Sequence, residues 1–268
     1  MWTYFYRRQF LKACRKNQVE RVIVCCRSRG LDVNTVSKDG WSGLVVAARY
    51  GSEAVVAWLL AQPGVQVNMA TADGGLTALM VACAAGHPDI VRRLVQAPGV
   101  GLNMRCDGTG WTAAHWAAIH SAACVEVLAR LPGLDWNVDS ACWLGTPLCC
   151  AVAWGNSGSV QALLSIPGVD LAARDSLNTP LSYLAVTQRE AATTDTEVVR
   201  LLAGLVEADW NYRDLAGDTP LMVALKDNML DIAKVLIQSP LVNVTIPDFQ
   251  GQTPEMFARY PYQFMGHQ

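Results

Sequence analysis

Two short phrases recur in step along this chain of 268 residues. A Pro-Gly pair followed by Val or Leu stands at residues 63–65, 98–100, 132–134 and 167–169. A Thr followed by Ala or Pro stands at positions 77, 112, 146, 179, 219 and 253, so neighbouring copies lie 33 to 40 residues apart. A period in the thirties over most of a chain predicts a stack of similar repeats instead of one closed globule.

Residues 107–137 show how one repeat is built. The glycines and Asp107 before Thr112 predict a tight turn, and the Thr hydroxyl predicts a helix N-cap. Small residues such as Ala117 and Ala118 predict a short helix that packs closely on its neighbours. A second, amphipathic helix follows, and Pro-Gly ends it. Because such a helix pair cannot bury both of its faces alone, we expect it to stack.

The order Gly-x-Thr-Pro/Ala-Leu-x-x-Ala, Gly-His, a Val/Leu-rich helix and Asp-Val-Asn resembles the ankyrin repeat over about residues 10–260. The resemblance implies an all-α fold, a solenoid of stacked helix-turn-helix units with β-turn fingers. His87 and His115 match the family's usual histidines, which implies hydrogen-bonding roles in the scaffold. Five residues match the family's loop asparagine, whereas Ala172 and Thr245 depart from it: Asn34, Asn68, Asn103, Asn137 and Asn211.

The repeats predict a single array over residues 1–268. A degenerate first unit covers about 5–36, six units span about 37–245, and a truncated last unit covers 246–268. After Pro261 no apolar residues remain for a second helix, so the last helix either caps the stack or belongs to a longer array. Residues 187–196 lengthen one turn, either as a tolerated surface insertion or as a projecting contact loop.

Composition excludes several classes of partner. The net charge of −2 and the pI of about 6.1 give no reason to expect nucleic acid or an anionic membrane. No apolar run reaches the roughly 18 residues of a membrane helix, and the first residues lack the apolar core of a signal peptide. Nine cysteines without a CxxC pair predict reduced, mostly buried thiols, no metal and no cofactor, in the cytoplasm or the nucleus.

No motif of an enzyme stands in a convincing context. A nucleophilic Cys–His pair would need Cys106 or Cys142 beside His115 or His120. Both cysteines fall in turns between repeats, and exposed turn cysteines are usually not catalytic. We therefore expect no catalytic residues and no enzymatic activity.

The nine tryptophans separate by their phase in the repeat. Four are expected to face the core: Trp58, Trp116, Trp136 and Trp210. Four others fall in turn fingers or at the end of a first helix, where the resemblance implies a concave surface that meets partners: Trp41, Trp111, Trp143 and Trp154. Exposed tryptophans there would suit a binding hot spot. The alternative is that they pack on the neighbouring finger and stiffen the array.

The sequence thus predicts a monomeric, non-enzymatic scaffold that binds a protein or peptide partner along its concave surface. The expected contacts are Trp41, Arg49, Tyr50, Trp111, His120, Trp143 and Trp154. We also expect Ala at both Trp111 and Trp143 to abolish binding with little change in the melting temperature. One alternative is the recognition arm of a larger enzyme, ligase adaptor, channel or signalling protein. Another, implied by the resemblance, is hydroxylation of a loop asparagine.

Overall fold

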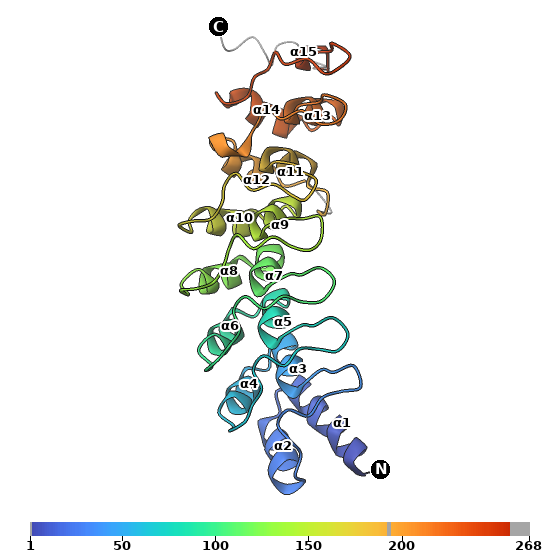
Figure 1. Ribbon diagram of the computed structural model, residues 1–268, viewed down its shortest axis with the longest axis vertical. Coiled ribbons are helices and arrows are strands. Elements are labelled where there is room, and N and C mark those ends of the chain that lie inside the picture. Colours follow the sequence, from blue (N-terminus) through green and yellow to red (C-terminus); the bar gives the residue numbers. More distant parts are fainter. Residues whose placement is uncertain (1, 192–193, 258–268) are drawn as a thin grey trace. The chain divides into compact units, whose positions relative to one another are not determined.

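The computed structural model describes residues 2–191 and 194–257, and its regular structure is almost entirely helical (Figure 1). Within these residues, β-structure is limited to two isolated bridges, Val36 with Ser42 and Arg174 with Pro180. The all-α prediction is therefore confirmed. The chain divides into two compact units, Met1–Cys142 and Trp143–Gln268. The single array without an internal boundary stays a prediction.

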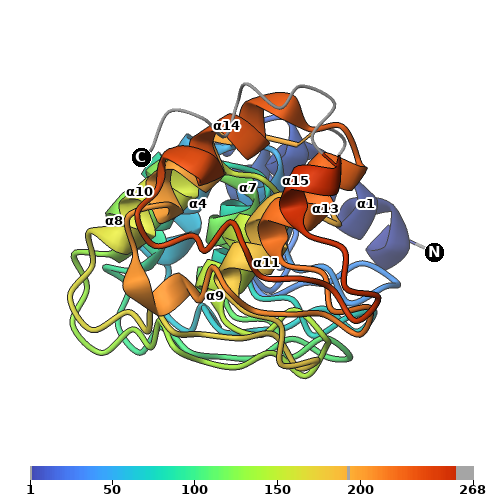
Figure 2. The same cartoon turned by 90° about the horizontal axis from the view of Figure 1, so that it is seen from above.

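The first unit consists of four successive helical hairpins. Its helices are α1 (Trp2–Arg15), α2 (Val19–Ile23) with the π-helix η1 (Val24–Ser28), α3 (Gly43–Arg49), α4 (Glu53–Leu60), α5 (Ala78–Ala84), α6 (Pro88–Leu94), α7 (Ala113–His120) and α8 (Ala122–Leu128). The first helices pack in the order α1, α3, α5, α7, and the second helices in the order α2, α4, α6, α8. Figure 2 shows α4 and α8 on one side of this unit and α1 on the other.

The second unit repeats the same arrangement. Its helices are α9 (Pro147–Ala153), α10 (Ser157–Leu164), α11 (Leu181–Thr187), α12 (Thr196–Leu202), the 3-10 helix η2 (Val206–Ala208), α13 (Pro220–Lys226), α14 (Leu230–Gln238) and α15 (Pro254–Phe257). The first helices pack in the order α9, α11, α13, α15. The expectation about Pro261 lies outside the described residues.

Hydroxyl caps and small residues explain the short first helices. Thr77 Oγ1 accepts a hydrogen bond from the Met80 amide at 3.3 Å, and the Thr112 amide donates to His115 Nδ1 at 3.1 Å. Each bond satisfies a backbone amide that the start of a helix leaves unpaired, or closes a capping box. Alanines at the helix contacts are completely buried and let neighbouring first helices approach closely: Ala47, Ala82, Ala117, Ala151, Ala185 and Ala224.

One first helix begins differently from the prediction. Helix α11 starts at Leu181, and Pro180 precedes it in an extended conformation, with φ −75° and ψ 164°. Pro180 forms a β-bridge with Arg174, and the Thr179 amide donates to Asp175 Oδ1 at 2.8 Å. The Thr N-cap that the repeat predicts is therefore wrong at Thr179, because the turn extends one residue further.

Loop asparagines connect successive repeats. Asn34 Nδ2 donates to the Gly64 carbonyl at 2.9 Å, and its Oδ1 accepts from the Gln66 amide at 2.8 Å. The same pair of backbone contacts recurs from Asn68 to Gly99 and Gly101, from Asn103 to Gly133 and Asp135, and from Asn211 to Leu241 and Asn243. We call these contacts the asparagine clamps. Each one holds the loop of the following repeat by its backbone.

The turn fingers also bond to one another through the backbone. The Ala72 amide donates to Asp39 O at 3.2 Å, and the Asp107 amide donates to Gly74 O at 3.0 Å. Gly40 lies at this contact with φ +77°, and a Cβ there would lie 2.5 Å from the Ala72 nitrogen. Both the positive φ and the close approach therefore require glycine.

The lengthened turn between α11 and α12 is fastened at both ends. Gln188 has a left-handed backbone with φ 34°, and its side chain is buried. Its amide group donates to the carbonyls of Ala185 and Asp195 and accepts from the Asp195 amide at 2.6 Å. The Glu190 amide donates to Ala153 O in α9. Residues 192–193 of the predicted contact loop lie outside the described part. The role of the loop in contacts stays a prediction.

Among the described residues, no helix is both long and apolar enough to cross a bilayer.

Candidate interaction surface

Trp41 begins the candidate surface of the first unit. It follows the first finger, and its Nε1–H donates to Asp73 Oδ2 in the next finger at 3.0 Å. This hydrogen bond holds the pKa of Asp73 below its usual range. The guanidinium of Arg49, at the end of α3, lies 5.2 Å from the centroid of the Trp41 ring. Trp41 is therefore half-buried, fixed at its edge by Asp73 and covered by Arg49.

Tyr50 stands directly after Arg49 and is the most open aromatic ring beside it. Its relative exposure is 45%. The guanidinium of Arg15, in the last turn of α1, lies 4.5 Å from its ring centroid. Cation–π contacts of this kind hold two arginines against two rings, and both arginines remain exposed.

A groove of about 1040 Å³ contains these residues. Helix α1 contributes one wall, and the first finger and α3 contribute the other. Five basic side chains but only one carboxylate, Asp39, belong to its lining; the basic residues are Arg8, Lys12, Arg15, Lys16 and Arg49. Among the described residues, none of these five cations forms an ion pair.

A second, apolar pocket of about 360 Å³ shares Arg49 and Tyr50 with the groove. Its other lining residues come from α5, the residue before Thr77 and α7: Leu76, Met80, Val81, Ala84, Ala85 and Trp116. The Nε1–H of Trp116 is buried and finds no acceptor among the described residues. An unpaired buried donor is costly. The pocket has mainly apolar walls, to which Trp116 contributes its ring.

Trp116 is held between two other aromatic side chains. Trp111 packs edge-on against it, with ring centroids 4.9 Å apart, and His120 stacks on it at 5.8 Å. Trp111 is only 9% exposed, and its Nε1–H donates to Cys142 Sγ at 3.0 Å. Burial lowers the pKa of His120. His120 is therefore a neutral ring at pH 7, placed at the exposed end of α7.

The second unit carries its own aromatic positions. Trp143 is 44% exposed, and the Arg189 guanidinium lies 5.6 Å from its ring centroid. Arg189 also pairs with the buried carboxylate of Asp175. Trp154, the C-cap of α9, lines an open pocket of about 600 Å³ with residues of the lengthened turn and α12. The second unit therefore has an exposed ring at Trp143 and an open pocket at Trp154.

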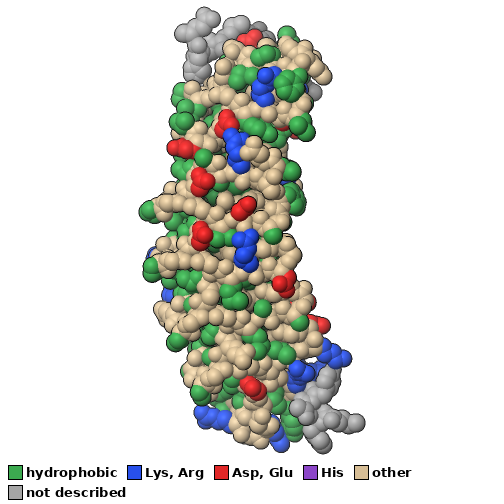
Figure 3. Space-filling model, viewed as in Figure 1, with side chains coloured by type: hydrophobic (Ala, Val, Ile, Leu, Met, Phe, Trp, Pro, Cys, Tyr) green, Lys and Arg blue, Asp and Glu red, His purple; other side chains and the backbone are tan. Residues whose placement is uncertain are grey.

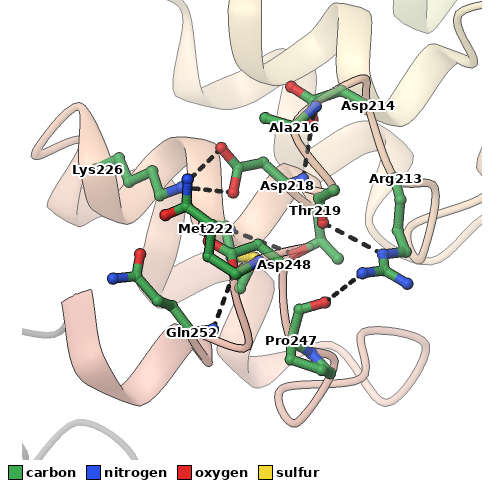
Figure 4. A network of polar contacts seen from close by, with 12 residues as sticks. Arg213, Asp214, Ala216, Asp218, Thr219, Met222, Lys226, Pro247, Asp248 and Gln252 are labelled. Carbon is green, nitrogen blue, oxygen red and sulfur yellow. Dashed lines mark hydrogen bonds and ion pairs between the residues drawn. The ribbon is translucent and has the colours of Figure 1, made fainter.

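A polar network joins α13 to the last finger (Figure 4). Lys226 Nζ contacts both oxygens of Asp218, at 2.6 and 2.8 Å, and lies 3.4 Å from Asp248 Oδ2. Although burial opposes it, the hydrogen bonds and charge of Asp218 hold the pKa of Lys226 above its usual value. Arg213 bonds the carbonyls of Gly217 and Pro247. The hydrogen bonds from Lys226 to Asp248 and from Arg213 to Pro247 connect one repeat to the next, so this network has a structural role.

The cysteines and acidic residues form no metal site in the part of the chain that is described. None of the nine cysteines, all within the described residues, forms a disulfide, and Cys106, expected in an exposed turn, is buried. Its Sγ lies 3.1 Å from Thr109 Oγ1.

The comparisons decide the family. A family model for ankyrin repeats, in three copies, matches residues 10–105, 67–140, 98–175 and 188–262. The chain belongs to the ankyrin repeat family. A search of the curated proteins finds no match. Ankyrin repeats are generally protein-interaction modules and are typically non-catalytic.

The ankyrin repeat assignments of the histidines are confirmed. His115 closes the capping box of α7, and His87 Nε2 lies 3.3 Å from the Arg49 carbonyl. Of the tryptophans expected in the core, Trp136 and Trp210 are buried, whereas Trp58 and Trp116 are only partly so.

The expected contact residues of this ankyrin protein fall into three groups. The groove brings Trp41, Arg49 and Tyr50 together. Trp111 and His120 meet at Trp116, but Trp111 is not exposed as predicted, because its indole packs on the next finger. Trp143 and Trp154 belong to the second unit. The contact role of all seven residues stays a prediction.

Sequence reasoning missed two parts of the surface. No contact role was predicted for the cations of α1, although Arg8, Lys12 and Arg15 follow the i, i+4, i+7 spacing of one helix face. That spacing was the available signal. Trp116 was assigned to the core, and its position one turn before His120 on α7 was the signal that it faces the same side.

Proposed function

We propose that this ankyrin repeat protein is a non-enzymatic scaffold that binds a polypeptide segment on the first unit. The binding surface consists of the groove beside α1 and the apolar pocket between α3, α5 and α7. The observation that carries the proposal is that the two adjoin through Arg49 and Tyr50. Together they offer aromatic rings, unpaired cations and an apolar hollow, which suit a polypeptide with mixed side chains.

Rigidity supports the same function. Backbone bonds between fingers and the asparagine clamps fix the frame that carries the groove. Trp41 is held by Asp73, and Trp116 is held by Trp111 and His120. A partner then loses little additional entropy in ordering these side chains, because they are already ordered. In this proposal Trp111 acts by supporting Trp116, and Trp143 and Trp154 offer a second contact on the other unit.

Site-specific photocrosslinking in native cells tests the proposal. A photoreactive phenylalanine analogue replaces Tyr50 in one variant and the exposed Gln96 of the second-helix side in the control. We expect polypeptide crosslinks from position 50 and not from position 96. The crosslinked segment, made as a synthetic peptide, is then titrated against the wild type and against Tyr50→Ala. A loss of at least tenfold in affinity supports the proposal, whereas equal affinities contradict it.

A further inference from the structure

The lining of the groove indicates the chemistry of its occupant. The protein as a whole is slightly acidic, with a net charge of −2, yet this groove gathers five basic side chains around one carboxylate. Figure 3 shows basic side chains next to the N-terminal end of the chain. Some acidic residues of the chain pair outside the groove, as Asp89 does with Arg92 on α6 and Asp175 with Arg189. The cations of the groove are left for a partner.

Two of these cations are already oriented. Arg15 lies over Tyr50, and Arg49 lies over Trp41, each at cation–π distance. A guanidinium that covers a ring with its face keeps its N–H groups directed sideways, where a carboxylate can accept two of them. Arg8 and Lys12 follow on the same side of α1 and extend the positive charge along the groove.

The adjoining pocket adds an apolar requirement. Its volume of about 360 Å³ and its lining of Leu76, Met80 and Trp116 suit one large apolar side chain. Since Arg49 and Tyr50 border both hollows, one short segment can occupy the two at once.

We infer that the groove and pocket bind an acidic peptide segment that carries one large apolar side chain. The carboxylates pair with the cations of α1 and with Arg49, and the apolar side chain enters the pocket beside Trp116. This inference rests on the proposed function, because it names the partner chemistry for the same surface.

A single-stranded nucleic acid is the competing occupant of a basic, aromatic groove. Such strands bind by stacking bases on exposed aromatic faces. Here one guanidinium lies over a face of Trp41 and another over a face of Tyr50, so fewer aromatic faces are open for base stacking. The observations therefore favour a peptide, whose carboxylates need only the guanidinium edges.

Fluorescence anisotropy with five labelled probes tests the inference. Four are 12-residue peptides: Asp/Glu-rich with a central Phe, Asp/Glu-rich with a central Ala, Lys-rich with a central Phe, and Ser/Gly-rich with a central Phe. The fifth is a 12-nucleotide oligouridine. We expect the acidic peptide with Phe to bind at least tenfold more tightly than every other probe, and to weaken as salt is raised. Tightest binding by oligouridine, or equal binding of all probes, overturns the inference.

Charge-reversed variants show whether the groove is responsible. Arg8→Glu with Lys12→Glu should weaken the acidic Phe peptide more than tenfold. The matched control, Arg93→Glu with Arg130→Glu, changes the same charge at exposed positions outside the groove and should change affinity less than threefold. Equal losses in both variants would show only long-range attraction and would overturn the assignment to the groove.

The pocket is tested by filling it. Ala85 is exposed at the end of α5 and lines the pocket, so Ala85→Trp should block it without disturbing the core. We expect this variant to bind the Phe and Ala forms of the acidic peptide equally, with an unchanged circular dichroism spectrum. A preserved preference for Phe contradicts the pocket assignment.

The two proposals fail separately. If the segment crosslinked at position 50 keeps its affinity for the Arg8→Glu/Lys12→Glu variant, the acidic partner is wrong and the scaffold function stands. If no polypeptide crosslinks there while the acidic Phe peptide binds, the groove has the stated chemistry but the proposed cellular function is wrong.

Discussion

The indole N–H of Trp111 donates to Cys142 Sγ at 3.0 Å, so this tryptophan, predicted to contact a partner, fastens one finger to the next. The same ring packs edge-on against Trp116. Its exposed fraction of 9% contrasts with 44% for Trp143. Two tryptophans that were both predicted to contact a partner therefore have different surroundings, and different effects of mutation are expected.

Replacement of Trp111 by Ala should lower the free energy of unfolding of the first unit by about 3 kcal/mol, as for a large buried aromatic side chain. Trp143→Ala should lower the free energy of unfolding of the second unit by only about 1 kcal/mol, because nearly half of that side chain is already in water. Urea unfolding followed by circular dichroism measures both. If the two variants unfold at the same urea concentration, the different packing of the two rings is wrong.

Asn68→Ala should destabilise the first unit by about 1–2 kcal/mol, because it removes both hydrogen bonds of one asparagine clamp. Gln96→Ala, at an exposed position of the following repeat, is the control and should leave the unfolding midpoint unchanged. A midpoint for Asn68→Ala equal to that of the control would mean that the clamp contributes nothing to stability.

Gln188→Ala should loosen the lengthened turn. The substitution removes three hydrogen bonds from a buried amide group and leaves Ala at a positive φ, so local opening becomes easier. Trypsin should cleave after Arg189 at least fivefold faster than in the wild type, as shown by mass spectrometry of timed digests. Thr194→Ala, in the same turn, is the control. Equal cleavage rates would contradict the anchoring role of Gln188.

The decrease in the free energy of unfolding at low pH, here called the acid limb, should depend on Asp214. Although burial opposes it, the hydrogen bond from Tyr183 at 2.6 Å and backbone amides hold the pKa of Asp214 below its usual range. A lowered native pKa means that the stabilisation is complete above the unfolded value of about 3.9 and is lost as pH falls toward the native value. Asp214→Asn should therefore lose stability at pH 7 and show a shallower decline below pH 4.

Urea unfolding at several pH values between 7 and 2.5 measures this difference. Tyr183→Phe removes one of the bonds to Asp214 and keeps the amides of Ala216 and Asp218, so its acid limb should lie between those of the wild type and Asp214→Asn. Parallel acid limbs for the wild type and Asp214→Asn would exclude the assigned role.

The repeat order predicted most of the fold because its signals are local. A Thr cap, small residues and a Pro-Gly stop each determine a few neighbouring backbone dihedrals, and their spacing determines the order of helices. Thr179 shows the limit of this reasoning. The bridge from Arg174 to Pro180 extends the turn by one residue, and residue type alone does not reveal that pairing.

The candidate surface was less predictable because exposure depends on neighbours from other repeats. Trp41, Arg49 and Tyr50, expected on one surface from their positions in the repeat, line one groove, and their contact role stays a prediction. The burial of Trp111 depends on Cys142, which lies 31 residues away. Most of the positive charge of the groove comes from α1 and the residue after it. This helix belongs to the first repeat, whose sequence departs most from the pattern, so the pattern could not predict the charge.

The asparagine clamps bear on how such a chain can change in length during evolution. Each clamp holds only a carbonyl and an amide of the following loop, so the side chains it meets do not matter. After duplication or loss of one whole repeat, the asparagine would meet an equivalent loop and form the same two hydrogen bonds. After duplication or loss of part of a repeat, it would meet backbone groups in the wrong positions. Proteins that gain or lose whole repeats should therefore still fold, whereas proteins in which a repeat is cut should not.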